Sequence, residues 1–168
     1  VAVASDSIAQ TLSVVHAFDG VAAANPAAGL ALGADGYLYG TAEAPAPGAL
    51  FRVRPDGSGF AVLHTFAAGT APSHAALARG PGNAFFGTTR TRGASGLGSV
   101  YRVEILGTSV NVTTLHEFSA PDGYPDGGVI VASDGMLYGT FGDGSTTTNA
   151  VYAVAQDGTG YRVVSDLQ

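Results

Sequence analysis

The chain has 168 residues, which is enough for one domain with a sizeable hydrophobic core. Its formal net charge of −6 argues against nucleic-acid binding, because contacts to phosphates need a basic protein face. The absence of cysteine excludes disulfide bonds, thiolate metal ligands and a cysteine nucleophile, and no apolar run is long enough to span a bilayer.

The first patterned stretch is the apolar run from Leu12 to Phe18, so residues 1–11 are expected to form an N-terminal extension. This run ends in His-X-Phe and predicts a strand. Three further landmarks follow in order: a proline before small and apolar residues, the stretch "DGYLYGT", and the alternating run "LFRV". Alternation of apolar and polar residues is the pattern of a half-buried strand, and the Asp-Gly pairs predict turns between strands.

The four landmarks recur in the same order twice more along the chain. The repeated histidines His16, His64 and His116 lie 48 and then 52 residues apart. The chain closes on "YRVVSDL", where Ser165 and Leu167 stand in place of the histidine and the phenylalanine. Four short strands in a repeat of about 50 residues are typical of a β-propeller blade.

We therefore predict an all-β, β-propeller-like fold in a single repeat domain over residues 12–168. Three four-stranded blades are expected near residues 26–66, 72–118 and 125–167, together with one extra N-terminal strand at Leu12 to Phe18. Three blades are too few for a closed ring, because propellers close with about four to eight blades. We expect the ring to be completed by other copies of the chain or by further blades, since each repeat needs neighbours to bury its faces.

The repeated blocks resemble the GloVer tandem repeat, with Pro-x-x-Gly-Leu, Asp-Gly-x-Leu-Tyr-Gly-Thr, a short Val-Phe/Tyr strand and Leu-His-x-Phe. The resemblance is specific in the first and third blocks, which contain "DGYLYGT" and "DGMLYGT". The second block departs from it, because "RGPGNAFFGT" lacks Asp-Gly and carries Phe85-Phe86 in place of Leu-Tyr. The resemblance implies a propeller-like fold in a bacterial protein of the extracellular space, cell surface or periplasm. It implies no catalytic residues.

Three repeated histidines would suffice to bind a metal ion if they came together. However, they occupy equivalent strand positions in different blades, and such positions lie far apart around a ring. We therefore interpret each histidine as a residue that fills a half-buried slot and bonds to a neighbouring turn.

The acidic, glycine-rich loops are a second candidate for metal binding. Asp122, Asp126 and Asp143 would suit Ca²⁺, which prefers carboxylate and carbonyl oxygens. Their spacing matches no EF-hand loop, and turn formation explains the same residues without a metal. We favour no cofactor and keep Ca²⁺ as the alternative.

Four residues are candidates for ligand binding. Arg90 and Arg92 would share one face of a strand and grip a carboxylate or a sulfated sugar. His74 is the one histidine outside the repeat pattern and precedes an inner strand, where the mouth of a propeller channel would lie. Tyr124 is one of several tyrosines that would serve as a stacking platform for a sugar ring.

The favoured function is a non-catalytic, exported propeller module that acts as a structural or protein-interaction subunit of a larger assembly, as a homo-oligomer or with other proteins. The alternative is a carbohydrate-binding propeller with a shallow pocket at each blade or junction, stacking sugars on Tyr37, Tyr39, Tyr124 or Tyr138. A hydrolase or lyase at the channel mouth ranks lowest, because there is no Gly-x-Ser-x-Gly motif and no repeated carboxylate pair. No nucleic-acid partner and no membrane span are expected.

Overall fold

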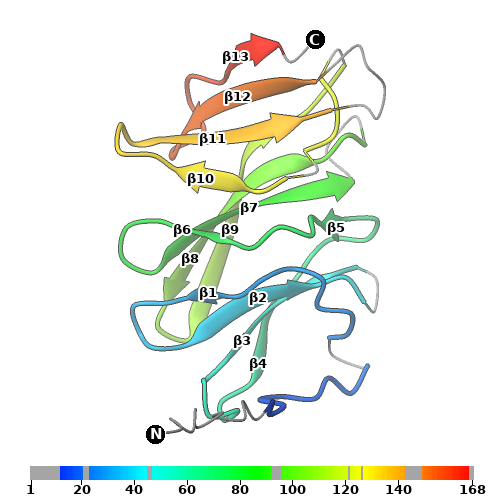
Figure 1. Cartoon of the computed structure of the whole chain (residues 1–168), viewed down its shortest axis with the longest axis vertical. Helices are drawn as coiled ribbons and strands as arrows, with labels where there is room; N and C mark the ends of the chain where they lie inside the picture. Colours follow the sequence, from blue (N-terminus) through cyan, green and yellow to red (C-terminus); the bar gives the residue numbers. More distant parts are fainter. Residues whose placement is uncertain are drawn as a thin grey trace, which may run out of the picture.

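The computed structural model describes residues 12–20, 23–44, 47–91, 96–120, 122–125, 127–142 and 149–166. Every secondary-structure element assigned in these ranges is a β-strand. None of the described residues lies in a helix that could cross a membrane. Three antiparallel sheets follow one another along the long axis of the molecule, in the order of the sequence (Figure 1). The prediction of an all-β chain built of successive blades is confirmed.

Blade 1 contains, in spatial order, β1 (Ala31–Leu32), β2 (Leu38–Ala42), β3 (Ala49–Val53) and β4 (Ala61–Thr65). Blade 3 has the same order in β10 (Val129–Val131), β11 (Met136–Phe141), β12 (Ala150–Ala155) and β13 (Arg162–Asp166). Blade 2 contains β7 (Ala84–Thr91), β8 (Ser99–Leu106) and β9 (Ser109–Glu117), and two short strands, β5 (Ala71–Pro72) and β6 (Ala78–Arg79), both pair with β7. The inner position of blade 2 is therefore divided between two strands.

The extra N-terminal strand expected at Leu12 to Phe18 is not formed: this segment is described, and no strand is assigned to it. In the later blocks the corresponding run pairs with the preceding strand of its own blade, as His64 does with Leu50. No such strand precedes this segment among the described residues, so the backbone ladder has no partner. The segment instead packs through its rings, with His16 stacked on Phe60 at 3.9 Å between centroids.

The glycine of the aromatic-Gly-Thr motif lies directly opposite an aromatic residue of the next strand in every blade. A Cβ at Gly87 would lie 2.5 Å from the ring of Tyr101, so no residue larger than glycine fits beneath that ring. This close approach explains why the motif keeps glycine in all three blocks. The three cross-strand pairs are Gly40 with Phe51, Gly87 with Tyr101, and Gly139 with Tyr152.

The phenylalanine of each His-X-Phe motif packs against the same covering ring, but in the following blade. The centroid distances are 5.0 Å for Phe18–Phe51, 5.3 Å for Phe66–Tyr101 and 5.1 Å for Phe118–Tyr152, all with edge-to-face geometry. Each such aromatic pair is worth about 0.5–1.5 kcal/mol beyond the area that it buries. One buried cluster accordingly joins blades 1 and 2, and another joins blades 2 and 3.

The departure of the second block from the repeat consists of two linked changes. In blade 1 the Tyr39 hydroxyl donates to Asp35 Oδ2 at 2.7 Å, and in blade 3 Tyr138 donates to Asp134 Oδ2 at 2.7 Å. The aspartate thus fixes both its own turn and the tyrosine of the next strand. The corresponding residues of blade 2 are Gly82 and Phe86, so the acceptor and the donor are lost together.

Replacing the phenylalanine at the junction between blades 2 and 3 should strongly destabilise the chain. Phe118 is fully buried and contacts Tyr152 of blade 3. We expect Phe118→Ala to lower the free energy of unfolding by about 3–5 kcal/mol, because it leaves a cavity between two blades. Urea denaturation measures this loss. The matched control is Leu106→Ala, at a position 64% exposed, and equal losses in the two variants would contradict the prediction.

Candidate functional site

The repeated histidines are half-buried, as predicted, and His16 and His116 each pack against the blade that follows them. The expected bond to a neighbouring turn is not formed by His116 Nε2, which is buried without a hydrogen-bond partner among the described residues. His116 stacks on Tyr161 with ring centroids 3.5 Å apart and an interplanar angle of 11°. His16 stacks on Phe60 in the same way. Burial lowers the pKa of His116 below the ordinary histidine value, and Asp122 and Glu117 oppose this shift.

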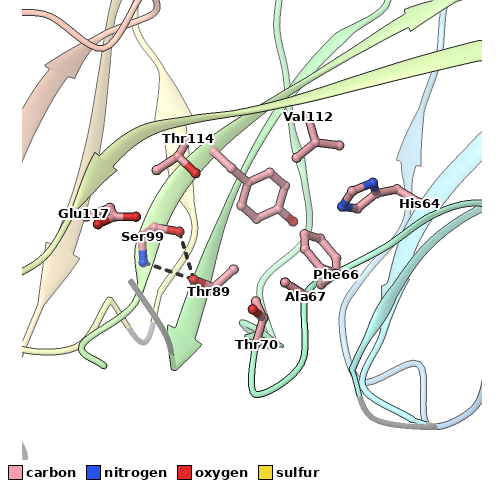
Figure 2. Close-up of a pocket in the computed structure, with 10 residues that line it drawn as sticks. His64, Phe66, Ala67, Thr70, Thr89, Ser99, Val112, Thr114 and Glu117 are labelled. Atoms are coloured by element: carbon pink, nitrogen blue, oxygen red, sulfur yellow. Dashed lines mark hydrogen bonds between the residues drawn. The ribbon is translucent and has the colours of Figure 1, made fainter. Parts of the chain in front are cut away.

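The junction between blades 1 and 2 differs from the other two, because its repeat histidine, His64, has no stacked ring among the described residues and faces a cavity of about 450 Å³ (Figure 2). The cavity lies between blades 1 and 2, beside His64 and Phe66, with Val112 and Thr114 of β9 on its other side (Figure 2). Burial lowers the pKa of His64, so the neutral imidazole is favoured here. The full lining consists of His64, Phe66, Ala67, Thr70, Thr89, Ser99, Tyr101, Val112, Thr114 and Glu117.

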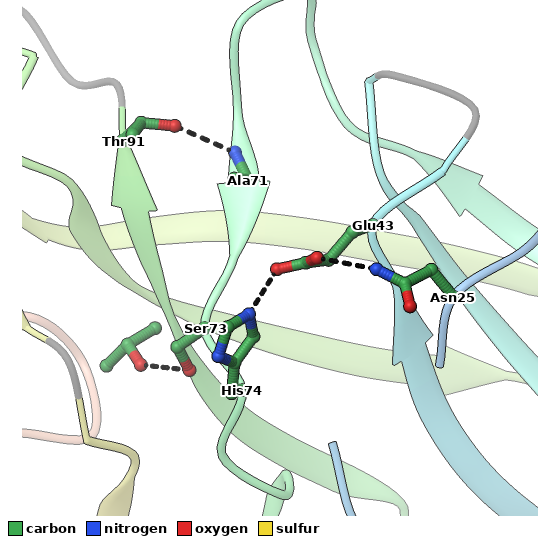
Figure 3. Close-up of polar contacts among 7 residues, drawn as sticks. Asn25, Glu43, Ala71, Ser73, His74 and Thr91 are labelled. Carbon is green, nitrogen blue, oxygen red and sulfur yellow. Dashed lines mark hydrogen bonds and ion pairs between the residues drawn. The ribbon is translucent and has the colours of Figure 1, made fainter. Parts of the chain in front are cut away.

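A second site is organised around Glu43, directly after β2. Its Oε1 lies 2.5 Å from His74 Nε2, and its Oε2 accepts a hydrogen bond of 2.9 Å from Asn25 Nδ2 (Figure 3). The carboxylate also lines a pocket of about 270 Å³ together with Arg90 and Tyr124. Three predicted ligand-binding residues thus lie around one carboxylate that the sequence analysis did not single out. The fourth, Arg92, lies outside the described residues.

The backbone at Asn25 positions its amide toward Glu43. Asn25 has a φ of +54°, a left-handed conformation that asparagine adopts more readily than most residues. The Glu43 N–H donates to the Asn25 carbonyl at 3.3 Å, and an isolated bridge between Ala24 and Ala44 brackets this contact. The segment before blade 1 is thereby tied to the end of β2, and through Glu43 to the loop that carries His74.

Ser73 and His74 are neighbours in sequence, but they do not form a catalytic pair. Ser73 is buried, and its Oγ lies 2.7 Å from Thr88 Oγ1, which in turn lies 2.8 Å from the Gly127 carbonyl oxygen. The Ser73 hydroxyl therefore faces blade 3 through Thr88, while the His74 imidazole faces Glu43 (Figure 3). This arrangement binds loops together and supplies no activated nucleophile.

Of the three aspartates considered for Ca²⁺, the structure describes one. Asp122 lies near Tyr161, whose pKa is raised by burial and, to a smaller extent, by this carboxylate. Asp126 and Asp143 lie outside the described residues. Within the described ranges no three His, Cys, Asp or Glu side chains are arranged to hold a metal ion, so Ca²⁺ binding stays a prediction.

The four tyrosines considered as sugar platforms differ in access. Tyr39 is fully buried, so its ring is not a platform for a ligand. The guanidinium group of Arg52 lies 4.4 Å from the ring centroid of Tyr37 and covers one face of that ring. Tyr124 is 39% exposed, and Tyr138 is half-buried.

The profile of the Gloeobacter/Verrucomicrobia repeat matches residues 4–168 of the sequence. The chain belongs to this repeat family. A search of curated proteins finds no match. The prediction of a GloVer-type repeat is therefore confirmed, and it now rests on nearly the whole chain.

Solved structures with the same fold are β-propeller proteins. A chain of the nidogen/laminin complex superposes with a TM-score of 0.59 at 20% identity, covering 83% of this chain and 48% of that one. TolB from Acinetobacter baumannii gives a TM-score of 0.59 at 14% identity over 92% of this chain and 35% of that one. Putative TolB from Agrobacterium tumefaciens gives 0.57 at 15% identity over 78% and 43%. The chain thus spans less than half the length of these propellers.

The left-handed residue beside Glu43 gives a test of how this site is held. We expect Asn25→Ala to lower the free energy of unfolding by about 1–2 kcal/mol, because alanine is strained at this φ and the hydrogen bond to Glu43 is lost. Asn25→Gly loses the same hydrogen bond but relieves the strain, so its loss should be smaller. Urea denaturation of both variants decides; a larger loss for glycine would contradict the argument.

The buried histidines predict that the chain loses stability in mild acid. Burial lowers the pKa of His64 and His116 in the folded chain, so the unfolded chain takes up protons first as the pH falls. The free energy of unfolding should therefore be highest above the ordinary histidine pKa of about 6.5 and fall below it. Urea denaturation from about pH 7.5 to about pH 5.5 measures this slope. The double variant His64→Asn, His116→Asn should flatten it, and an unchanged slope would refute the assignment.

Proposed function

We propose that the chain is a non-catalytic, exported propeller module whose two free blade faces bind other blades of the same repeat. It would thereby act as a structural or protein-interaction subunit of a larger assembly. The observation that carries this proposal is the exposure of Ile130, which is 66% exposed although its counterpart in blade 1, Ala31, is 8% exposed. The likeness to the TolB propellers supports placing the assembly outside the cytoplasm, in the periplasm, at the cell surface or in the extracellular space.

The free face of blade 3 presents the positions that the next blade covers elsewhere in the chain. In blade 1, Tyr39 is fully buried and Thr41 is 4% exposed. In blade 3 the same motif leaves Tyr138 half-buried and Thr140 exposed. Ile130 pairs directly with Tyr138, as Ala31 pairs with Tyr39, so Ile130, Tyr138 and Thr140 belong to one face of blade 3. We expect another blade to bind to this face.

The free face of blade 1 is the complementary half of the same junction. At the internal junction the ring of Phe85 packs against Tyr39 with centroids 4.7 Å apart. The residue of blade 1 that corresponds to Phe85 is Leu38, and it lines an apolar groove of about 290 Å³. The other groove residues are Val15, His16, Phe18, Pro26, Ala28, Leu30, Phe51 and Val53. A blade bearing Tyr138 would therefore meet in this groove the surroundings that Tyr39 has inside the chain.

These faces join head to tail, and such contacts close into rings when the rotation permits. The coverage of less than half of each propeller neighbour supports a need for further blades. The further blades would come from a second copy or from additional repeats in a longer chain. Two copies would give six blades, within the range of about four to eight that closes a propeller.

The assembly proposal predicts the mass of the 168-residue chain in solution. We expect light scattering after size exclusion to give at least twice the chain mass of 16.7 kDa. Ile130→Glu should shift the species toward the monomer, because a buried, unpaired charge at the junction is costly. The matched control is Leu106→Glu, which places the same charge at a position 64% exposed on the β8–β9 hairpin, away from the free faces.

A folded wild-type monomer at all concentrations would overturn assembly from copies of this chain. An oligomer that survives Ile130→Glu but is lost in Leu106→Glu would place the contact elsewhere and overturn the role of the blade 3 face.

A further inference from the structure

The cavity beside His64 exists because one ring of the repeat is missing. The outer strands of the three blades align by their pairing with Phe51, Tyr101 and Tyr152 of the third strands. This alignment places Phe60, Val112 and Tyr161 at one repeat position, two residues before the paired residue. At two junctions this residue is an aromatic ring stacked on the repeat histidine. At the junction between blades 1 and 2 this residue is Val112, and the space in front of His64 is open.

The junction between blades 2 and 3, where the stacked ring is present, indicates what shape of ligand fits the cavity between blades 1 and 2. Tyr161 places a flat, six-membered ring parallel to the imidazole of His116 and carries a hydroxyl near Asp122. Thr70 occupies the position equivalent to Asp122, four residues after the motif phenylalanine, and it lines the cavity. A six-membered ring stacked on His64 would therefore present a ring hydroxyl to Thr70.

The walls of the cavity offer more hydrogen-bonding groups than a single phenol hydroxyl needs. Thr89 and Ser99 are 3% and 8% exposed, and Thr89 Oγ1 lies 3.0 Å from Ser99 Oγ and accepts a 3.0 Å hydrogen bond from the Ser99 N–H (Figure 2). These two hydrogen bonds fix the positions of both side chains without a ligand. Thr114 and the carboxylate of Glu117 add further polar groups to the lining.

The lining is rich in hydroxyl groups. Among the described residues that line the cavity, none is a lysine or an arginine, so the lining offers an anionic ligand no cation to pair with. The hydroxyl groups of Thr70, Thr89, Ser99 and Thr114 can each donate and accept hydrogen bonds, which suits a neutral polyhydroxyl compound. The volume of about 450 Å³ lies within the range of about 300–1,000 Å³ that is usual for small-molecule sites.

We propose that the cavity between blades 1 and 2 binds a neutral pyranose sugar, stacked on the His64 imidazole, with its hydroxyls bound by the threonine and serine side chains of the walls. The aliphatic face of a pyranose and the flat ring of Tyr161 are similar in size, which is why the internal junction serves as a template. The multiple polar groups of the walls favour the sugar over a phenol. This site is separate from the free blade faces, so it does not depend on assembly of the ring.

The test is a titration of the isotope-labelled chain followed by NMR. The probes are the neutral monosaccharides glucose, galactose, mannose and N-acetylglucosamine, with p-cresol as the phenolic comparison. We expect at least one sugar to give saturable shifts at the His64 imidazole and at the methyl groups of Thr70 and Thr114. Shifts with p-cresol and none with the sugars would overturn the proposal, as would shifts with neither.

Two variants locate the site. Val112→Tyr restores the missing ring, so it should weaken sugar binding at least about tenfold while the thermal midpoint is kept or raised. The matched control is Thr113→Tyr, which adds the same ring to the opposite face of β9 and should leave binding unchanged. Sugar binding that survives Val112→Tyr would overturn the proposal.

Thr114→Val provides a second readout that does not fill the cavity. It keeps the side-chain shape and removes one hydroxyl from the wall, so it should weaken sugar binding roughly three- to tenfold. Unchanged binding in this variant, together with loss in Thr113→Tyr, would place the sugar on the other face of β9 and would reject the cavity.

Discussion

One contact links the blades of this chain into a continuous structure: a phenylalanine from the end of one block packs against the ring that covers a glycine in the next block. The outer strand therefore belongs to its own blade through the backbone ladder and to the following blade through its side chain. Because the glycine, the covering ring and the phenylalanine recur together, Phe66 and Phe118 each need the following blade in order to be buried. Blade stability in this fold is shared between neighbours.

The middle block shows how the repeat varies without losing that contact. Gly82 and Phe86 remove the Asp-Tyr hydrogen bond of the other two blades, yet Phe86 stays fully buried. Val112 removes the ring that stacks on histidine at the other junctions, and a cavity with polar walls lies there. Both changes spare Tyr101 and Phe66, which form the inter-blade contact. The second block thus keeps the contact between blades, whereas the residues around that contact differ from those of the other blocks.

The local sequence was sufficient to predict the order of the strands in blades 1 and 3, because motif, turn and alternation recur, but not the division of the inner position of blade 2 between β5 and β6. It was insufficient for Leu12 to Phe18, because an apolar run predicts a strand but a strand also needs a ladder partner. The gathering of His74, Arg90 and Tyr124 around Glu43 depends on the packing of different blades, which no local pattern encodes. The signal at Val112 was present in the sequence, as a missing aromatic residue, and aligning the three outer strands would have found it.

The forward direction of the phenylalanine contact has a consequence for how such chains change over generations. Every internal junction is made from the same positions of two successive blocks, so a recombination event that adds or removes one whole period recreates an equivalent junction at the splice. An event that cuts within a period separates a ring from the glycine beneath it. A change by whole periods therefore preserves the contact between blades, whereas a change by part of a period breaks it.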